Sequence, residues 1–231
     1  MESDVSLRLA AVRERIAAAC RRAGRDPGEV TLVGASKTQP PESILAAFAA
    51  GLGTFGENRV QEAQAKAREL PAGIDWHLIG PLQTNKARSA AELFAAVHSL
   101  DRPKVALALD GEAARLARVV PCFLEVNLGG EQSKHSFARE GLVRSAAPLA
   151  DHAHLSIVGL MAIPPLEEDP EASRPWFRRL SRLRDELAAA GVLPGFPGWL
   201  SMGMSGDFEV AIEEGATHVR VGTALFGPRE A

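Results

Sequence analysis

The sequence predicts an α/β fold, a single (β/α)8 TIM barrel with an extra N-terminal helix. Eight short apolar segments with strand character alternate with amphipathic helical segments along the chain. The length of 231 residues suits one barrel of this kind, and a further helical segment precedes the first strand. A doubly wound open sheet is the alternative that the same alternation allows. We therefore expect one domain over residues 1–231.

The chain begins with an amphipathic helix expected at 4–23. Apolar residues recur at helical spacing from Val5 to Ile16, Ser3 is placed to cap the start, and Gly24 is placed to end the helix. This segment has no strand before it, so it is additional to the eight strand and helix pairs.

The remaining elements follow in regular alternation. The expected strands are 31–33, 54–56, 75–78, 93–98, 121–127, 155–161, 199–202 and 217–221. The expected helices are 42–50, 59–70, 83–91, 102–118, 138–149, 171–190 and 207–214. Pro40 and Pro41 open the helix at 42–50, and Gly51 ends it. Two Pro-rich stretches, 163–170 and 194–198, have the composition of loops within one domain.

Composition excludes several classes of partner. The net charge is −3, which recruits neither nucleic acid nor an anionic membrane surface. Cys20 and Cys122 are the only cysteines and lack CxxC spacing, which argues against a disulfide scaffold or a zinc site. The sequence shows no signal peptide and no apolar run long enough to span a membrane. We expect a cytoplasmic monomer without a metal site.

Lys37 is the first candidate for chemistry. It follows the small residues Gly34, Ala35 and Ser36 at the carboxyl end of the first strand, which is the end where α/β barrels bind ligands. A desolvated lysine amine can attack a carbonyl and hold it as a Schiff base. A solvated lysine at a strand end is the alternative that this stretch leaves open.

Two glycine-rich segments predict a phosphate site. Ser205 is placed to cap the helix expected at 207–214, and Gly203 lets backbone amides approach a ligand closely. Gly222 and Thr223 leave the eighth strand, and in barrels the loops after strands seven and eight often bind phosphate. A plain serine cap and two tight turns are the alternative. Together with Lys37, these segments indicate an aldehyde that carries a phosphate, and pyridoxal 5'-phosphate (PLP) fits.

Other motifs favour structural interpretations. The match to GxGxxG at 51–56 follows a helix and leads into a strand, so we interpret it as a helix stop. The histidines at 77, 98, 152, 154 and 218 are interpreted as satisfied or core histidines. The arginines between 174 and 184 share their helix with an apolar face, and we expect them on its solvated side.

Six stretches resemble a known family. They are Val-Gly-Ala-Ser-Lys-Thr at 33–38, Phe-Gly-Glu-Asn-Arg-Val-Gln-Glu at 55–62, Trp-His-Leu-Ile-Gly-Pro-Leu-Gln-Thr-Asn-Lys at 76–86, Gly-Leu-Met-Ala-Ile-Pro at 159–164, Leu-Ser-Met-Gly-Met-Ser-Gly-Asp at 200–207 and Val-Arg-Val-Gly-Thr-Ala-Leu-Phe-Gly at 219–227. They resemble the YggS/PROSC family of pyridoxal phosphate homeostasis proteins, which are single-domain barrels similar to the N-terminal domain of alanine racemase.

The resemblance implies a set of cofactor-binding residues. Lys37 would be the Schiff-base lysine, Ser205, Gly222 and Thr223 would hold the phosphate, Asn58 and Met204 would line the cofactor, and Arg220 would face the pyridine nitrogen. A guanidinium stays protonated and disfavours a protonated ring nitrogen, so strong carbanion chemistry is not expected. A structural ion pair is the alternative role for Arg220.

The resemblance also implies a function in PLP homeostasis. Lys37 would hold PLP reversibly, buffer it and deliver it to apo PLP-dependent enzymes. The chain contains no tyrosine, so the tyrosine base of alanine racemase is missing, and we assign no catalytic residue. A PLP-dependent amino-acid racemase, a cofactor-free Schiff-base aldolase and a protein-interaction module remain alternatives.

One segment departs from the family pattern. Where the family usually has Ser-Lys-x-Gly, this chain has Ser-Lys-His-Ser at 133–136, so Lys134 is given no role. We expect this loop near the mouth of the cofactor site.

Overall fold

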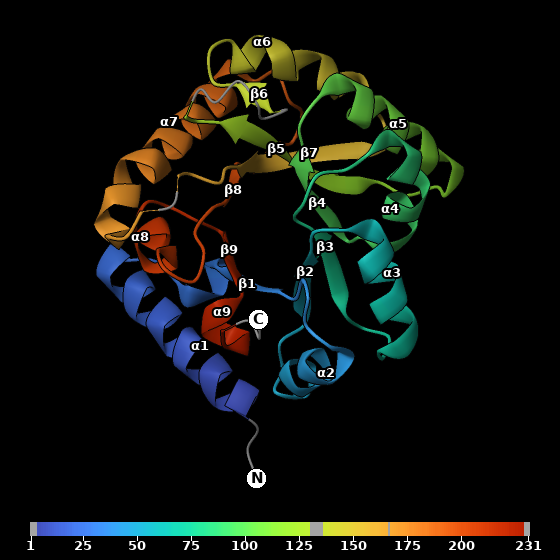
Figure 1. Ribbon diagram of the computed structural model, residues 1–231. Coiled ribbons are helices and arrows are strands. Elements are labelled where there is room, and N and C mark those ends of the chain that lie inside the picture. Colours follow the sequence, from blue (N-terminus) through green and yellow to red (C-terminus); the bar gives the residue numbers. More distant parts are fainter. Residues whose placement is uncertain (1–3, 130–135, 166, 229–231) are drawn as a thin grey trace.

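The computed structural model describes residues 4–129, 136–165 and 167–228. Within them, eight parallel strands pair in the order β4-β3-β2-β1-β9-β8-β7-β5, and pairing of β4 with β5 closes the sheet into a barrel (Figure 1). The expected (β/α)8 barrel is therefore confirmed, and the open-sheet alternative is wrong because the two outer strands pair with each other.

The strands match the expected segments closely. They are β1 (Thr31–Ala35), β2 (Thr54–Glu57), β3 (Asp75–Leu78), β4 (Ala96–Leu100), β5 (Val120–Asn127), β7 (Leu155–Met161), β8 (Trp199–Ser201) and β9 (His218–Val221). A ninth strand, β6 (Phe137–Ala138), pairs with β5 outside the barrel.

Helices surround the barrel on its outer side (Figure 1). The α-helices are α1 (Asp4–Ala23), α2 (Pro41–Ala49), α3 (Val60–Glu69), α4 (Ala87–Leu93), α5 (Pro103–Arg115), α6 (Leu142–Ala146), α7 (Arg174–Ala190), α8 (Phe208–Glu213) and α9 (Thr223–Phe226). In the described ranges, short 3-10 helices lie at η1 (Pro27–Glu29), η2 (Thr84–Lys86), η3 (Ala147–Asp151) and η4 (Pro170–Ser173).

The extra helix α1 completes the outer layer. It packs against α8, α9 and α2, and it buries Leu9, Val12 and Ile16. Arg25, just beyond it, donates to the carbonyl oxygens of Ile212 and Ala216, both at 2.8 Å. Because α9 is only four residues long, α1 covers the part of the barrel that a helix after β9 would otherwise cover. Gly24, at φ 66°, ends α1 as expected, whereas the proposed Ser3 cap lies outside the described residues.

Several expected boundaries were shifted, and two of these shifts have a clear physical reason. The helix expected at 138–149 is interrupted, because Gly141 has φ 78° and separates β6 from α6. The strand expected at 93–98 lies two to three residues later, because α4 continues to Leu93. The polar Ser99 belongs to that strand, where its hydroxyl donates to the Gly80 carbonyl oxygen at 2.6 Å.

Polar and aromatic rings fill part of the barrel interior. The rings of His77 on β3 and His218 on β9 lie 6.3 Å apart, although β2 and β1 separate these strands in the sheet. His98 stacks on Phe123 at 4.3 Å, and Phe123 also contacts His218. These contacts join side chains across the barrel, so they place the rings inside it. The interpretation of these three histidines as core residues is confirmed, since each is buried.

Within the described ranges, no helix has the length and apolarity that crossing a membrane would require.

Candidate functional site

The predicted site residues follow four neighbouring strands. Lys37 lies two residues beyond β1, and Asn58 directly follows β2. The remaining residues lie on or after β8 and β9, and they are Met204, Ser205, Arg220, Gly222 and Thr223. The barrel order β2-β1-β9-β8 makes these strands adjacent, and since they are parallel their carboxyl ends share one rim. A Cβ atom added at Gly222 would lie 3.4 Å from the carbonyl oxygen of Ala35, so the β9 loop touches the segment that carries Lys37.

Lys37 is partly buried, and side chains of α3 anchor the backbone on both sides of it. The ammonium of Lys66, on α3, donates to the Ser36 carbonyl oxygen at 2.8 Å. The Thr38 amide donates to Glu62 Oε1 at 2.8 Å, and Lys66 also contacts that carboxylate at 2.8 Å. Thr38 has φ 66°, a conformation that a β-branched residue rarely adopts, so this chain segment is held under local strain.

Glu57 is the buried carboxylate behind this segment. Its Oε1 accepts from the Ser36 hydroxyl at 2.6 Å and from Lys66 at 2.7 Å. Its Oε2 has no hydrogen-bond partner within the described part of the chain. Burial raises the pKa of Glu57, and Lys66 and Ser36 oppose that rise. Burial alone would raise the pKa of Glu62, but the Lys66 ammonium and the Thr38 amide outweigh that effect, so the pKa of Glu62 is lowered.

No expectation from the sequence included this network, which is formed by Ser36, Glu57, Glu62 and Lys66. One signal was present, because Glu62 and Lys66 are spaced i,i+4 on an expected helix. The contact between Lys66 and the Ser36 carbonyl joins residues 30 positions apart, so no local pattern indicates it.

Ser205 does not cap α8, so that expectation was wrong. The N-cap of α8 is Asp207, and the Asp207 carboxylate accepts from the Met204 amide at 2.7 Å. The Ser205 hydroxyl oxygen instead accepts from the amides of Gly222 and Ala224, both at 3.2 Å. The loops after β8 and β9 therefore meet at one point, where two amides and a hydroxyl converge. Thr223, between these amides, is exposed.

Arg220 is buried in the barrel wall. Its Nη1 donates to the Ser201 carbonyl oxygen at 2.8 Å and to the Ser201 hydroxyl at 2.6 Å, and its Nη2 donates to the Ala162 carbonyl oxygen at 3.0 Å. Among the described residues no carboxylate lies within ion-pair distance of Arg220, so its partners are neutral. Burial lowers the pKa of Arg220 to about 10, against the opposing charges of Asp207 and Glu125, so the guanidinium stays protonated at neutral pH.

A chain of hydrogen bonds runs from Arg220 into the barrel. The Ser201 hydroxyl accepts from Arg220 and lies 2.7 Å from His98 Nδ1, and His98 Nε2 lies 2.9 Å from His77 Nδ1. Burial lowers the pKa of His98 well below its usual value and that of His77 to about 4, so both rings are neutral at pH 7. The tautomers of the two histidines are coupled, because the nitrogen of His98 that carries the proton sets the direction of its contacts with both Ser201 and His77.

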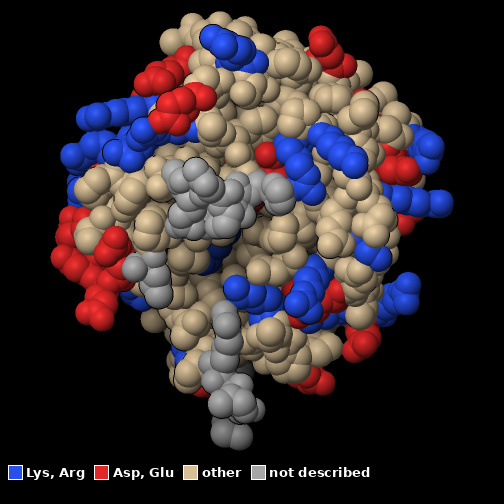
Figure 2. Space-filling view, turned by 45° about the horizontal axis from the view of Figure 1, so that its top comes forward, with Lys and Arg blue, Asp and Glu red and all other residues tan. Residues whose placement is uncertain are grey.

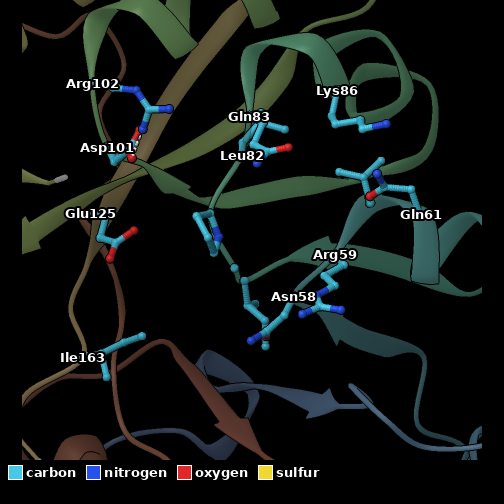
Figure 3. Close-up of a pocket in the computed structure, with 14 residues that line it drawn as sticks. Asn58, Arg59, Gln61, Leu82, Gln83, Lys86, Asp101, Arg102, Glu125 and Ile163 are labelled. Atoms are coloured by element: carbon cyan, nitrogen blue, oxygen red, sulfur yellow. Dashed lines mark hydrogen bonds and ion pairs between the residues drawn. The ribbon is translucent and has the colours of Figure 1, made fainter. Parts of the chain in front are cut away.

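A cavity of about 740 Å³ lies beside Asn58 (Figure 3). Residues after β2, β3, β4 and β7 line it together with Glu125 on β5, and Asn58 is the only predicted site residue among these lining residues. Lys and Arg side chains lie around a hollow in the surface of the molecule (Figure 2).

The other motifs and residues that the sequence singled out do not belong to this site. Gly51 follows α2 and leads into β2, so the interpretation of 51–56 as a helix stop is confirmed. His152 and His154 lie 3.4 and 3.9 Å from the Asp110 carboxylate. Among described residues, no three His, Cys, Asp or Glu side chains are grouped to hold a metal ion. Lys134 lies outside the described residues.

The arginines on α7 are only partly solvated. Arg174 reaches α8, where it pairs with Glu213 at 2.7 Å and Glu214 at 2.9 Å, and Arg178 pairs with Glu214 at 2.9 Å. These contacts join α7 to α8, so the expectation of a purely solvated face was incomplete.

Comparison with known proteins places this geometry in a family. The model of the alanine racemase N-terminal domain matches residues 7–230. A protein of *Aquifex aeolicus* named pyridoxal phosphate homeostasis protein is 46% identical, over 96% of this chain and 97% of that protein. The chain belongs to the pyridoxal phosphate homeostasis protein family. A *Pseudomonas aeruginosa* member of that name is 43% identical, over 99% of this chain and 97% of its own length.

Solved structures agree with this assignment. PipY of *Synechococcus elongatus*, solved with PLP bound, has a TM-score of 0.84 and 38% identity, covering 97% of this chain and 100% of that chain. PipY solved without PLP has a TM-score of 0.85 at 38% identity and the same coverage. Alanine racemase of *Corynebacterium glutamicum* has a TM-score of 0.68 at 17% identity, covering 96% of this chain and 62% of that enzyme, which shows a shared fold alone.

Proposed function

We propose that this chain is a cytoplasmic PLP-binding protein of PLP homeostasis, which holds PLP reversibly on Lys37 and buffers it or delivers it to apo PLP-dependent enzymes. The observation that carries the proposal is the full-length relationship to proteins of that name, together with a neighbour at 38% identity whose structure contains PLP. We further propose that it acts as a monomer.

The local geometry fits PLP. Lys37 is partly exposed at the strand rim, where its amine is accessible to an aldehyde. Where the β8 and β9 loops meet, the Gly222 and Ala224 amides donate to the Ser205 hydroxyl oxygen, both at 3.2 Å, which leaves the hydroxyl proton to donate to a phosphate. In the proposal, Ser205, Gly222 and Thr223 hold the phosphate, and Asn58 and Met204 line the cofactor.

Arg220 limits the chemistry of the proposed site. Bound PLP supplies an aldehyde carbon that reacts with amines and a pyridine ring that withdraws electrons most strongly when its nitrogen is protonated. The buried Arg220 guanidinium keeps its own proton at neutral pH and is a donor only, so it would hold an unprotonated ring nitrogen. This arrangement favours holding and releasing PLP over bond cleavage in amino acids.

The proposal is tested by labelling. The protein is incubated with PLP, reduced with borohydride and digested, and the modified peptide is identified by mass spectrometry. We expect a pyridoxyl group on Lys37, no label in Lys37→Ala, and an unchanged melting temperature, because a partly exposed side chain contributes little to the core. Lys104→Ala, which removes an exposed lysine from α5, is the matched control. A label that persists in Lys37→Ala, or no specific label at all, would refute the assignment.

A further inference from the structure

The cavity beside Asn58 is not accounted for by the proposed cofactor-binding residues. Its volume of about 740 Å³ is in the range of small-molecule binding sites. It is lined largely by the stretches 58–61 and 79–83 with Lys86, which belong to two of the six segments that resemble the family. Of these lining residues the proposed function uses Asn58 alone, so the role of the rest is open.

The floor of the cavity is formed by tightly packed backbone. A Cβ atom at Gly80 would lie 2.5 Å from the backbone oxygen of Asn58, so only glycine allows the loop after β3 to pack on the loop after β2. The Gly80 carbonyl oxygen is in turn held by the Ser99 hydroxyl on β4 at 2.6 Å. The ends of three neighbouring strands therefore fix this part of the cavity wall.

The two sides of the cavity differ in charge. Arg59, Gln61 and Lys86 lie on one side of the close-up, and Asp101, Arg102 and Glu125 lie on the other (Figure 3). Arg102 forms an ion pair with Asp101. Within the described residues neither Arg59 nor Lys86 lies within ion-pair distance of a carboxylate, although the Glu62 charge acts on Arg59, so this side carries two positive charges without an ion-pair partner. Gln61 and Gln83 add amide groups that can donate hydrogen bonds.

We propose that this cavity is a second ligand site, which binds a small molecule carrying a carboxylate or a phosphate through Arg59 and Lys86. Arginine provides a forked pair of donors and lysine a point charge, and both groups suit such an anion. This proposal rests on the proposed function, because it defines a site separate from the PLP site on Lys37. The two sites share one residue, Asn58. A ligand in this cavity would therefore contact Asn58, a side chain that also lines the proposed PLP site.

The test uses protein in which the first site is blocked. PLP is fixed to Lys37 with borohydride, and the mass of the product is measured. The backbone amide resonances of Gln61, Gly80 and Gln83 are then followed by NMR during titration with inorganic phosphate and, separately, with succinate at constant ionic strength. We expect saturable shifts of these three resonances. Saturation by phosphate alone assigns a phosphate ligand, saturation by succinate alone assigns a carboxylate, and saturation by both assigns a site for either group.

A pair of double variants separates the site from general surface charge. Arg59→Gln with Lys86→Gln should weaken the affinity by about tenfold or more, because it removes both charged donors. Arg88→Gln with Lys104→Gln changes the net charge equally at exposed positions outside the cavity and should leave the affinity unchanged. Shifts that never saturate, or an affinity that survives the Arg59 and Lys86 substitutions, would overturn the second site. A missing pyridoxyl mass would instead count against the proposed function, and the same titration of the unmodified protein would still test the cavity.

Discussion

Lys66 shows how a single side chain can position another that it does not touch. Its ammonium reaches the Ser36 carbonyl and the Glu57 and Glu62 carboxylates, all within 2.8 Å. Glu62 then holds the Thr38 amide, so the backbone before and after Lys37 is tied to α3. We infer that Lys66 is a positioning residue for Lys37.

Replacing Lys66 tests this inference. Lys66→Met should lower the free energy of unfolding by roughly 3 kcal/mol, since it leaves the buried Glu57 carboxylate without its cation. It should also slow pyridoxyl labelling of Lys37 in protein that is still folded, because residues 36–38 lose their anchor. Denaturant unfolding and the labelling rate are the two measurements. Lys66→Arg should restore part of the rate, and Lys104→Met should change neither quantity. A normal labelling rate in Lys66→Met would limit Lys66 to a stabilising role.

Ser205 offers a second test at the scale of one residue. Its hydroxyl oxygen lies between the Gly222 and Ala224 amides, where we propose that the phosphate binds. Ser205→Ala should weaken PLP binding by about 1 kcal/mol or more, the scale of a hydrogen bond to a charged group. Equilibrium binding, monitored by the absorbance of PLP, measures the change. An unaltered dissociation constant would remove Ser205 from the proposed phosphate site.

At the scale of elements, the barrel depends on close contact between strands. A Cβ atom at Gly159, on β7, would lie 2.1 Å from the backbone oxygen of Trp199 on β8 and 2.9 Å from the Phe123 ring. Backbone cannot move aside as a flexible side chain can, so only glycine fits at this crossing. Gly111, on the exposed side of α5, has no atom within 4 Å of its added Cβ.

These two glycines form a matched pair for mutagenesis. Gly159→Ala should destabilise the protein by roughly 1–3 kcal/mol or more through overpacking. Gly111→Ala should stabilise it by about 0.5–1 kcal/mol, because alanine loses less backbone entropy than glycine in a helix. Thermal and denaturant unfolding of both variants measure the difference. Equal effects of the two substitutions would contradict the close packing of β7 on β8.

The alternation of elements was predictable from local pattern, and their ends were less so. The limits of β3 and β7 agree with the expected segments. The helix expected at 138–149 failed at Gly141, since the sequence alone does not reveal that this glycine adopts a positive φ. The strand expected at 93–98 did not include Ser99, whose hydroxyl bonds to the Gly80 carbonyl 19 positions earlier, a contact that no local pattern indicates.

At the scale of the whole molecule, three neutral histidines inside the barrel make stability depend on pH. Burial lowers the pKa of His77 to about 4 and that of His218 to about 3, and it lowers the pKa of His98 well below 6.5. In the unfolded chain each histidine takes up a proton as the pH falls through about 6.5, whereas the native protein does not. Stability is therefore retained above about pH 6.5 and is lost as the pH falls from there toward 4.

His77→Gln should make this loss shallower. Each such histidine contributes a slope of up to about 1.4 kcal/mol per pH unit between its unfolded and native pKa values, and the variant lacks one of them. Unfolding free energies measured by denaturant between pH 7.5 and 5 report the slope. His154→Gln changes a half-exposed histidine and is the control. The same slope in His77→Gln as in the unchanged protein would contradict a neutral, buried His77.

The sequence by itself determined the barrel, its extra helix and the identity of Lys37, Ser205, Gly222 and Arg220 as residues at or near strand ends, because these follow from short-range periodicity and from segments that resemble a family. Only the tertiary structure decided what those residues contact. Ser205 lies between amides of the β9 loop and does not cap α8, and Arg220 bonds to Ser201 and the Ala162 carbonyl with no carboxylate partner in the described chain. The anchor from Lys66 to Ser36 and the cavity beside Asn58 likewise join separate segments. Closure of the barrel creates these contacts, and no pattern confined to neighbouring residues encodes which strand ends will meet.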